Sequence, residues 1–314
     1  MDSMILIRDQ IKTIYSRYAV YIDPVLKFML ALITYIAING SVGHMRVLKN
    51  PVLVVLVALL NAVLPASAVL PIACISVILH MYSISLLCAV IVGALFTLLF
   101  LLYFRFAPKD SMLVLLTPLA FILHIPYALP ICAGLLGNAY SCVSVVCGVI
   151  AYYVIVYVAN SALSLEGTDV EKMTASFRTF FGGIIGNKTM LLVLVAFAAT
   201  TLLVYLVRRL SIDYAWYIAI GAGIVTDFLI ILIGNSMMNL EVSVFALFIG
   251  SIIAIPIALI VKFFCFYPDY AKTEILQFED DEYYYYVKAV PKLKVISGKE
   301  NTNRSAERNF RRGS

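Results

Sequence analysis

The chain has 314 residues, of which 63% are hydrophobic and 13% are charged, and its mean hydropathy is +0.99. Soluble domains carry roughly 25% charged residues. This composition therefore excludes a soluble globular protein and indicates an integral membrane protein in contact with the lipid bilayer. The net charge of +5 is small, and the basic residues are divided between short loops and the tail, which argues against a partner such as nucleic acid.

The cysteines all lie within apolar stretches and show no spacing typical of a zinc or redox site. We interpret them as small packing residues: Cys74, Cys88, Cys132, Cys142, Cys147 and Cys265. Neither a metal nor another cofactor is expected.

Residues 1–23 alternate apolar and charged side chains at helix-like spacing. This pattern predicts an amphipathic helix on the membrane surface. Charges interrupt the apolar residues, so no cleavable signal peptide is expected. A transmembrane domain over residues 24–265 and a polar tail over residues 266–314 follow.

Two apolar stretches of the transmembrane domain are interrupted by prolines. Proline removes a backbone donor and breaks or kinks a helix. Helix breaks are therefore expected at Pro65 and Pro71 in the first stretch and at Pro118, Pro126 and Pro130 in the second.

Similar motifs recur in the two stretches, which indicates a duplication of residues 49–106 and 109–163. Lys49-Asn50 corresponds to Lys109-Asp110, and Leu70-Pro71-Ile72 corresponds to Leu129-Pro130-Ile131. If each repeat holds one broken crossing and one whole crossing, the repeats are parallel and Lys49 and Lys109 lie on the same face. Re-entrant hairpins in place of the broken crossings would instead make the repeats inverted. We expect the parallel arrangement.

Three further apolar stretches, at about residues 189–207, 214–235 and 242–265, are each long enough to cross a ~30 Å bilayer core. The predicted fold is an all-α, polytopic transmembrane helix bundle with about eight spans. Basic residues near the span ends are equally divided between the two faces, and only the basic tail favours cytoplasmic termini. The expected location is the plasma membrane.

Asp227 lies in the middle of an apolar stretch, where an ionised carboxylate is costly. We expect it to be shielded from lipid, either as a proton or cation site or as a neutral group bound to a neighbouring helix. Asn61 and His124 lie in the broken segments, where freed backbone groups need partners. These three residues are the candidate transport site, with structural hydrogen bonds as the alternative. No catalytic arrangement is present, so enzyme activity is not indicated.

The tail contains the acidic and aromatic sequence FEDDEYYYYVKAVPK over residues 278–292. This sequence resembles the tail of an uncharacterised family of bacterial multi-pass membrane proteins, and the resemblance implies no activity. The strand propensity of this run suggests that it adds to the sheet of a protein partner, with Tyr283, Tyr284, Tyr285 and Tyr286 as docking candidates. A disordered tail held at anionic headgroups is the alternative.

Two functions are compatible with these patterns. Repeated, proline-broken spans are typical of a permease for a small solute or ion, with its binding site near the middle of the bilayer. The alternative is a non-transporting scaffold or assembly subunit whose tail recruits a partner. A cavity that brings together Asn61, His124 and Asp227 would favour the permease.

Overall fold

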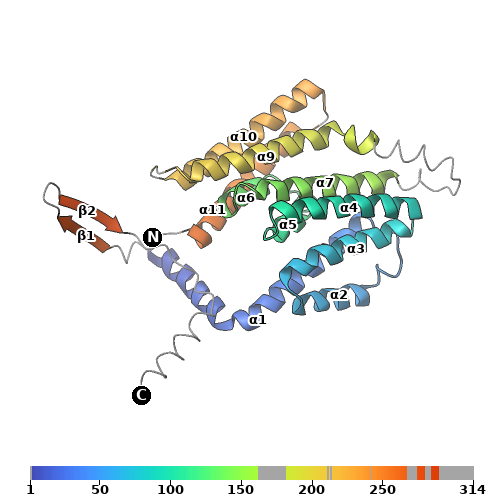
Figure 1. The fold of residues 1–314 in the computed structure, drawn as a ribbon, viewed down its shortest axis with the longest axis horizontal. Helices are drawn as coiled ribbons and strands as arrows, with labels where there is room; N and C mark the ends of the chain where they lie inside the picture. The colour runs from blue at the N-terminus through green and yellow to red at the C-terminus, as the bar shows by residue number, and fades with distance from the viewer. Residues whose placement is uncertain are drawn as a thin grey trace, which may run out of the picture. The chain divides into compact units, whose positions relative to one another are not determined.

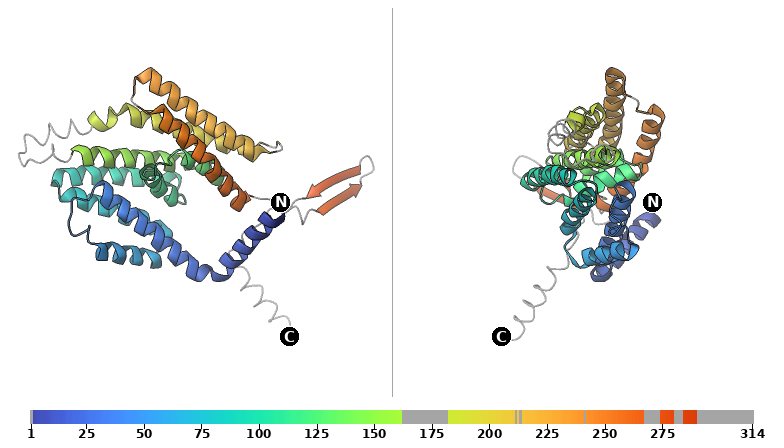
Figure 2. Two further views of the ribbon diagram at one scale, coloured as in Figure 1. Left: turned by 180° about the vertical axis from the view of Figure 1, so that it is seen from behind. Right: turned by 90° about the vertical axis from the view of Figure 1, so that its right-hand side faces the viewer.

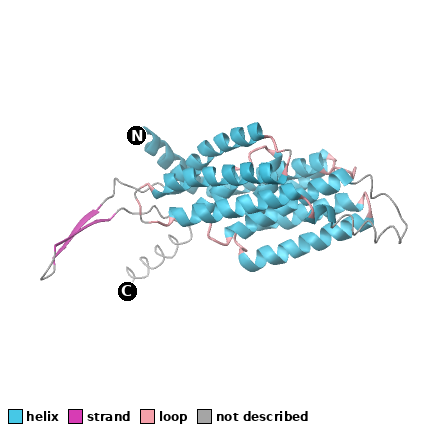
Figure 3. Ribbon diagram, turned by 90° about the horizontal axis from the view of Figure 1, so that it is seen from above, coloured by secondary structure: helices cyan, strands magenta, loops and turns pink. Residues whose placement is uncertain are grey.

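A computed structural model describes residues 2–161, 182–210, 212, 214–240, 242–266, 274–279 and 284–289. The chain divides into two compact units, Val20–Leu259 and Met1–Ala19 with Ile260–Ser314. Helices make up the described part of the first unit, whereas the described strands are confined to the tail (Figure 3).

The helices of the described residues differ widely in length. They are α1 (Asp2–Ser41), α2 (Pro51–Val63), the short 3₁₀ helix η1 (Ala66–Ala68), α3 (Val69–Tyr82), α4 (Leu86–Phe106), α5 (Ser111–Ile122), α6 (Ala128–Leu136), α7 (Ser141–Ser161), α9 (Lys188–Arg208), α10 (Ala215–Met238) and α11 (Val244–Phe266).

Six of the described helices are long and apolar enough to cross a membrane: α1, α4, α7, α9, α10 and α11. Their outward faces carry large apolar side chains, such as Leu101 at 65% and Phe245 at 73% exposure. A contiguous surface of this kind is typical of contact with lipid. The protein is a multi-pass membrane protein, and α4, α7 and α9 run roughly parallel to one another in it (Figure 1).

The number of eight spans is not confirmed, because the helices of the two broken segments are too short. α2 and α3 have 13 and 14 residues, and α5 and α6 have 12 and 9. At ~1.5 Å per residue none of them is longer than about 21 Å, well short of a ~30 Å core.

The first broken segment folds back on itself. Asn50 caps the start of α2, and its side chain accepts a hydrogen bond from the Val52 amide at 3.0 Å. At the other end of the segment, Nδ1 of His80 accepts a hydrogen bond from the Met45 amide at 3.2 Å. Met45 lies in the loop that precedes α2, so the start of α2 and the end of α3 lie on the same side of the unit. We call this segment hairpin 1 (residues 51–82).

The second broken segment folds back in the same way. The Ser141 hydroxyl, at the start of α7, donates to the carboxylate of Asp110 and accepts from the Asn138 amide. Asp110 immediately precedes α5, and Asn138 follows α6. The start of α5 therefore lies beside the end of α6, and we call this segment hairpin 2 (residues 111–136).

Fewer of the prolines break a helix than the sequence predicts. Pro65 lies between α2 and η1, and Pro126 lies between α5 and α6. Pro71 and Pro130 instead occupy the first turns of α3 and α6, where the missing amide has no helical partner. α5 continues through Pro118, so the expected break there is wrong.

Cationic side chains bind the carbonyl groups at two helix C-termini. The ammonium of Lys27, from α1, donates to the Leu64 carbonyl at 3.3 Å, where α2 ends. The guanidinium of Arg208, from α9, donates to the Leu135 and Gly137 carbonyls at the end of α6. A cation at this position also offsets the negative end of the helix dipole.

Close helix packing around hairpin 2 depends on small residues. α6 packs against α9, and α9 packs along α10. The left view of Figure 2 shows α10 and α11 from behind. A Cβ atom at Gly134 of α6 would lie 2.7 Å from Cβ of Val204 and 2.8 Å from the Thr201 carbonyl. At Gly223 of α10 it would lie 2.4 Å from Cγ2 of Val204.

The second unit contains the N-terminal helix segment and part of the tail. α1 is interrupted at Tyr18, with φ −110° and ψ 17°, so a kink separates the helical segment before Tyr18 from the one after it. Arg8 is buried, with its guanidinium 5.9 Å from the centroid of the Phe263 ring.

In the tail, β1 (Glu274–Glu279) pairs antiparallel with β2 (Tyr284–Ala289), with Phe278 opposite Tyr285. The strand expected in the tyrosine run is therefore present over Tyr284–Ala289. Tyr283 lies outside the described residues.

Replacing Gly134 by alanine should destabilise the protein by ~1–3 kcal/mol, because the added methyl group meets backbone and a β-branched side chain. The matched control is Gly221→Ala in α10, where a Cβ atom meets nothing within 4 Å. Thermal unfolding in detergent, followed by size-exclusion chromatography, compares the two variants. Equal midpoints would show that α6 does not pack on α9 as described.

Candidate functional site

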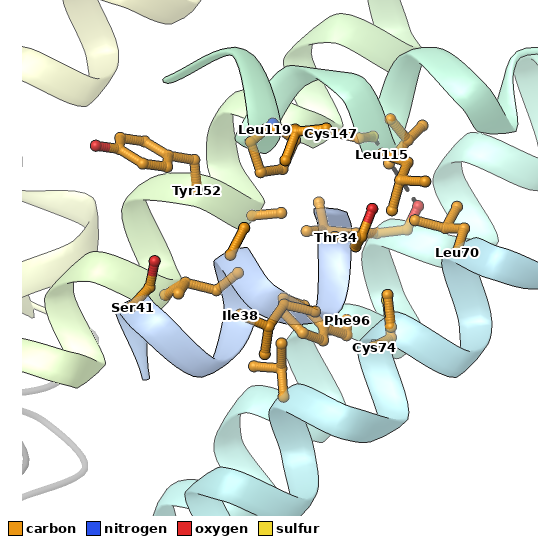
Figure 4. Close-up of a pocket in the computed structure, with 18 of the residues that line it drawn as sticks. Thr34, Ile38, Ser41, Leu70, Cys74, Phe96, Leu115, Leu119, Cys147 and Tyr152 are labelled. Atoms are coloured by element: carbon orange, nitrogen blue, oxygen red, sulfur yellow. Dashed lines mark hydrogen bonds between the residues drawn. The ribbon is translucent and has the colours of Figure 1, made fainter. Parts of the chain in front are cut away.

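A large cavity lies between the two hairpins. Its empty volume is about 900 Å³, including space at its open side. Side chains from α1, α3, α4, α5 and α7 point into it, and Figure 4 labels Thr34, Ile38, Ser41, Leu70, Cys74, Phe96, Leu115, Leu119, Cys147 and Tyr152.

The lining is apolar, and several of its polar groups are already bonded to backbone. The Thr34 hydroxyl donates to the Leu30 carbonyl at 2.8 Å, and the Tyr103 hydroxyl donates to the Pro108 carbonyl at 2.8 Å. The Cys147 thiol lies 4.0 Å from the Leu99 carbonyl. No lining residue is charged. The cavity therefore fits an uncharged, apolar molecule.

Asp227 is a separate feature, buried in α10 with 1% of its surface exposed. Its Oδ1 lies 3.5 Å from the Thr200 hydroxyl of α9, at the outer limit of a hydrogen bond. Its Oδ2 has no hydrogen-bond partner among the described residues. An ionised carboxylate in this setting would be costly, so the neutral form suits the site.

Tyr127 lies at the break in hairpin 2 and close to Asp227. It immediately precedes α6 and is close enough to Asp227 for an electrostatic interaction. Gly250 of α11 leaves room for its ring, since a Cβ atom there would lie 2.4 Å from Cδ2 of Tyr127. Asp227 therefore lies beside the break between α5 and α6.

Aromatic rings connect the cavity with the surroundings of Asp227. Tyr152 lines the cavity and stacks on Phe121, with ring centroids 4.4 Å apart. Phe121 stacks on Phe197 at 5.7 Å, and Phe197 meets Tyr127 edge-on at 6.3 Å. We call Tyr152, Phe121, Phe197 and Tyr127 the aromatic row.

The three candidate residues do not surround one cavity. Asn61 is fully buried and donates to the Tyr35 hydroxyl at 3.0 Å and to the Val57 carbonyl at 2.9 Å. Neither Asn61, His124 nor Asp227 lines the large cavity.

His124 has a structural position at the end of α5. It is exposed and adopts the left-handed conformation, with φ 59°. Its amide donates to the Phe121 carbonyl at 3.1 Å, and the Ile125 amide donates to the Ala120 carbonyl at 2.9 Å. This pair of bonds is the Schellman arrangement that ends many helices.

The sequence did not single out the cavity-lining residues, because leucine, valine and alanine have no pattern distinct from that of lipid-facing surface. For the two lining cysteines, Cys74 and Cys147, the sequence predicts only a packing role. The phenylalanines and tyrosines of the aromatic row were not identified either, since their positions are spread over α5, α7 and α9 and the start of α6.

Comparison with protein-family models, curated proteins and solved structures finds no match for this chain. The class of multi-pass membrane protein thus comes from the six apolar helices. The cavity, Asp227 and the two hairpins are the features that bear on function.

Replacing Asp227 by asparagine should leave folded yield unchanged and shift the free energy of unfolding by less than ~1 kcal/mol, because a neutral carboxyl and an amide are alike in size. Any ion-linked flux should change in this variant, since asparagine cannot take up or release a proton. Thr200→Val is the control that removes the neighbouring donor but keeps the carboxyl. A loss of stability of several kcal/mol in Asp227→Asn would instead indicate an ionised, paired carboxylate.

Proposed function

We propose that the protein is a permease that carries a small, uncharged and largely apolar solute across the plasma membrane. The observation that supports this most is the pair of short helical hairpins with a cavity between them. Interrupted helices that enter the bilayer only part of the way are typical of the substrate sites of secondary transporters.

The order of the elements favours hairpins that enter from opposite faces. Both ends of hairpin 1 lie together, and both ends of hairpin 2 lie together. Between them in the chain stands α4, a candidate span of 21 residues. A single crossing separates the two entry points, so hairpin 1 and hairpin 2 start from different faces.

This order makes the proposed repeats inverted rather than parallel. Each repeat, residues 49–106 and 109–163, holds one hairpin and one span, and an odd number of crossings reverses the orientation. The parallel arrangement expected from the sequence treated each hairpin as a crossing. The positions of matching residues support a duplication, since Pro71 and Pro130 are each the third residue of their helix and Asn50 and Asp110 each precede one.

Opposed hairpins give a physical route for transport. α5 of hairpin 2 packs against η1 and α3 of hairpin 1, and the cavity is lined by α3 and α5 together with the neighbouring spans. Displacement of one hairpin opens the cavity towards one face, and displacement of the other opens it towards the opposite face. The apolar lining selects an uncharged solute, and Asp227, beside the break in hairpin 2, is the candidate for coupling to protons.

Cysteine labelling of intact cells tests the inverted arrangement. In a variant without the native cysteines, single cysteines at positions 49 and 109 should react with a membrane-impermeant maleimide from opposite sides, because one crossing separates them. Both positions are exposed. Positions 188 and 209, also exposed at the two ends of α9, serve as controls, and position 188 should behave like 49 and position 209 like 109. Equal accessibility at 49 and 109 would contradict the proposal.

A scaffold function remains the second candidate, and the β-hairpin of the tail favours it. β1 and β2 pair only with each other in the part of the chain that the structure describes. A two-stranded sheet has an unpaired edge on each strand, to which an extended segment of another protein can add. Tyr283 to Tyr286 stay the proposed docking residues.

Deletion of residues 271–314 tests the scaffold. The transmembrane unit has its own buried core, so the truncated protein should insert into membranes and stay monodisperse in detergent. If the tail recruits a partner, affinity purification followed by mass spectrometry should find that partner with the intact protein and not with the truncated one. An unchanged set of co-purified proteins would contradict the scaffold function, and aggregation would mean that the tail belongs to the fold.

A further inference from the structure

We propose that the cavity between the hairpins is a binding site for a membrane lipid, with one acyl chain inserted between α1, α3, α4, α5 and α7. This inference deepens the proposed permease function and rests on it for the role of the site, because it names the acyl chain of a lipid as the apolar group that the cavity takes.

Water and polar solutes are excluded by the chemistry of the walls. A buried water needs two to four polar partners, and cavities lined by apolar side chains stay dry. Here the hydroxyl groups of Thr34 and Tyr103 already donate hydrogen bonds to backbone carbonyls. The remaining walls are formed mainly by leucine, isoleucine, valine, alanine and phenylalanine. A charged or strongly polar solute would lose its hydration without compensation.

A helix from a second protein is excluded by size. Along α7 the cavity extends from Cys147 to Val156, a length of about 14 Å at ~1.5 Å per residue. A helix of that length and ~10 Å diameter would fill roughly 1,100 Å³. The cavity holds about 900 Å³ even with its open side included. A narrow, flexible hydrocarbon chain fits this elongated space.

The cavity reaches the lipid-facing surface at Phe100. Of the residues that line it, Phe100 is the most exposed, at 41%, and the others are buried or half-buried. Phe100 stacks on Phe104, which is 60% exposed on the outer face of α4. The molecules next to that surface in a bilayer are lipids, whose acyl chains are as apolar as leucine. A chain can therefore enter sideways past Phe100 without crossing water.

The test is photo-crosslinking of the full chain in nanodiscs that contain a phospholipid with a diazirine at the end of one acyl chain. Mass spectrometry should locate crosslinks on cavity-lining residues of α3, α5 and α7, in addition to background labelling of the outer surface. Ala151→Phe, which fills the cavity from the half-buried face of α7, should abolish the cavity crosslinks. Ala94→Phe, at an exposed position of α4 that does not line the cavity, should leave them unchanged.

A second variant, which should increase crosslinking, distinguishes a specific effect on the cavity from misfolding. Phe100→Ala widens the entrance and should raise cavity crosslinking at the same total lipid concentration, whereas a misfolded protein would lose it. Crosslinks confined to the outer surface, or cavity crosslinks that persist in Ala151→Phe, would overturn the lipid assignment.

The lipid assignment and the permease function fail in different ways. Suppose that a small apolar fluorophore binds the cavity, that Ala151→Phe abolishes its binding, and that no lipid crosslinks form there. The lipid assignment is then contradicted, but the permease function is not. If lipid crosslinks form in the cavity but positions 49 and 109 are labelled from the same side, the binding site stands and transport by opposed hairpins fails.

Discussion

A backbone carbonyl or amide inside a bilayer has no water to bind, so every helix end at that depth needs a partner from the protein. Among the described helices, α2 ends at Val63 and α5 ends at Ile122, and both are too short to cross the bilayer. Lys27 binds the Leu64 carbonyl after α2, and the amides of His124 and Ile125 close the end of α5. These contacts satisfy backbone groups at the breaks of the two hairpins, whose helices are too short to span. The cavity and Asp227 both lie beside these hairpins.

Much of this architecture was predictable from the sequence, because the spans depend on local properties. Hydrophobic length located α9, α10 and α11 to within a few residues, and the breaks at Pro65 and Pro126 follow from the missing donor of proline. Pro118 shows the limit of that rule, since α5 continues through it. Whether a broken segment crosses or turns back depends on tertiary contacts such as that of His80 with Met45, which no local pattern encodes.

The candidate site was less predictable for a related reason. Rare polar residues stand out in an apolar sequence, which is why Asn61, His124 and Asp227 are the candidates, but the three lie at separate places in the fold. Asn61 joins α2 to Tyr35 of α1, and His124 ends α5. The cavity is a space that the surrounding side chains leave unfilled, and no distinctive residue type marks it in the sequence. Its walls are common apolar residues, so their shared position emerges only when five helices are assembled.

Any coupling between Asp227 and an apolar solute must act through packing, because an uncharged molecule does not respond to a distant charge. The aromatic row supplies such a contact path: Tyr127 lies beside Asp227, and Phe197 and Phe121 continue to Tyr152 at the cavity wall. Each ring contacts the next, so a shift of one ring displaces its neighbour. Tyr127 also stands at the break of hairpin 2, which is the element that has to move in the proposed transport cycle. In the proposed cycle, a change in the carboxyl of Asp227 that displaces Tyr127 would therefore shift both the hairpin and the cavity wall, although Asp227 does not line the cavity.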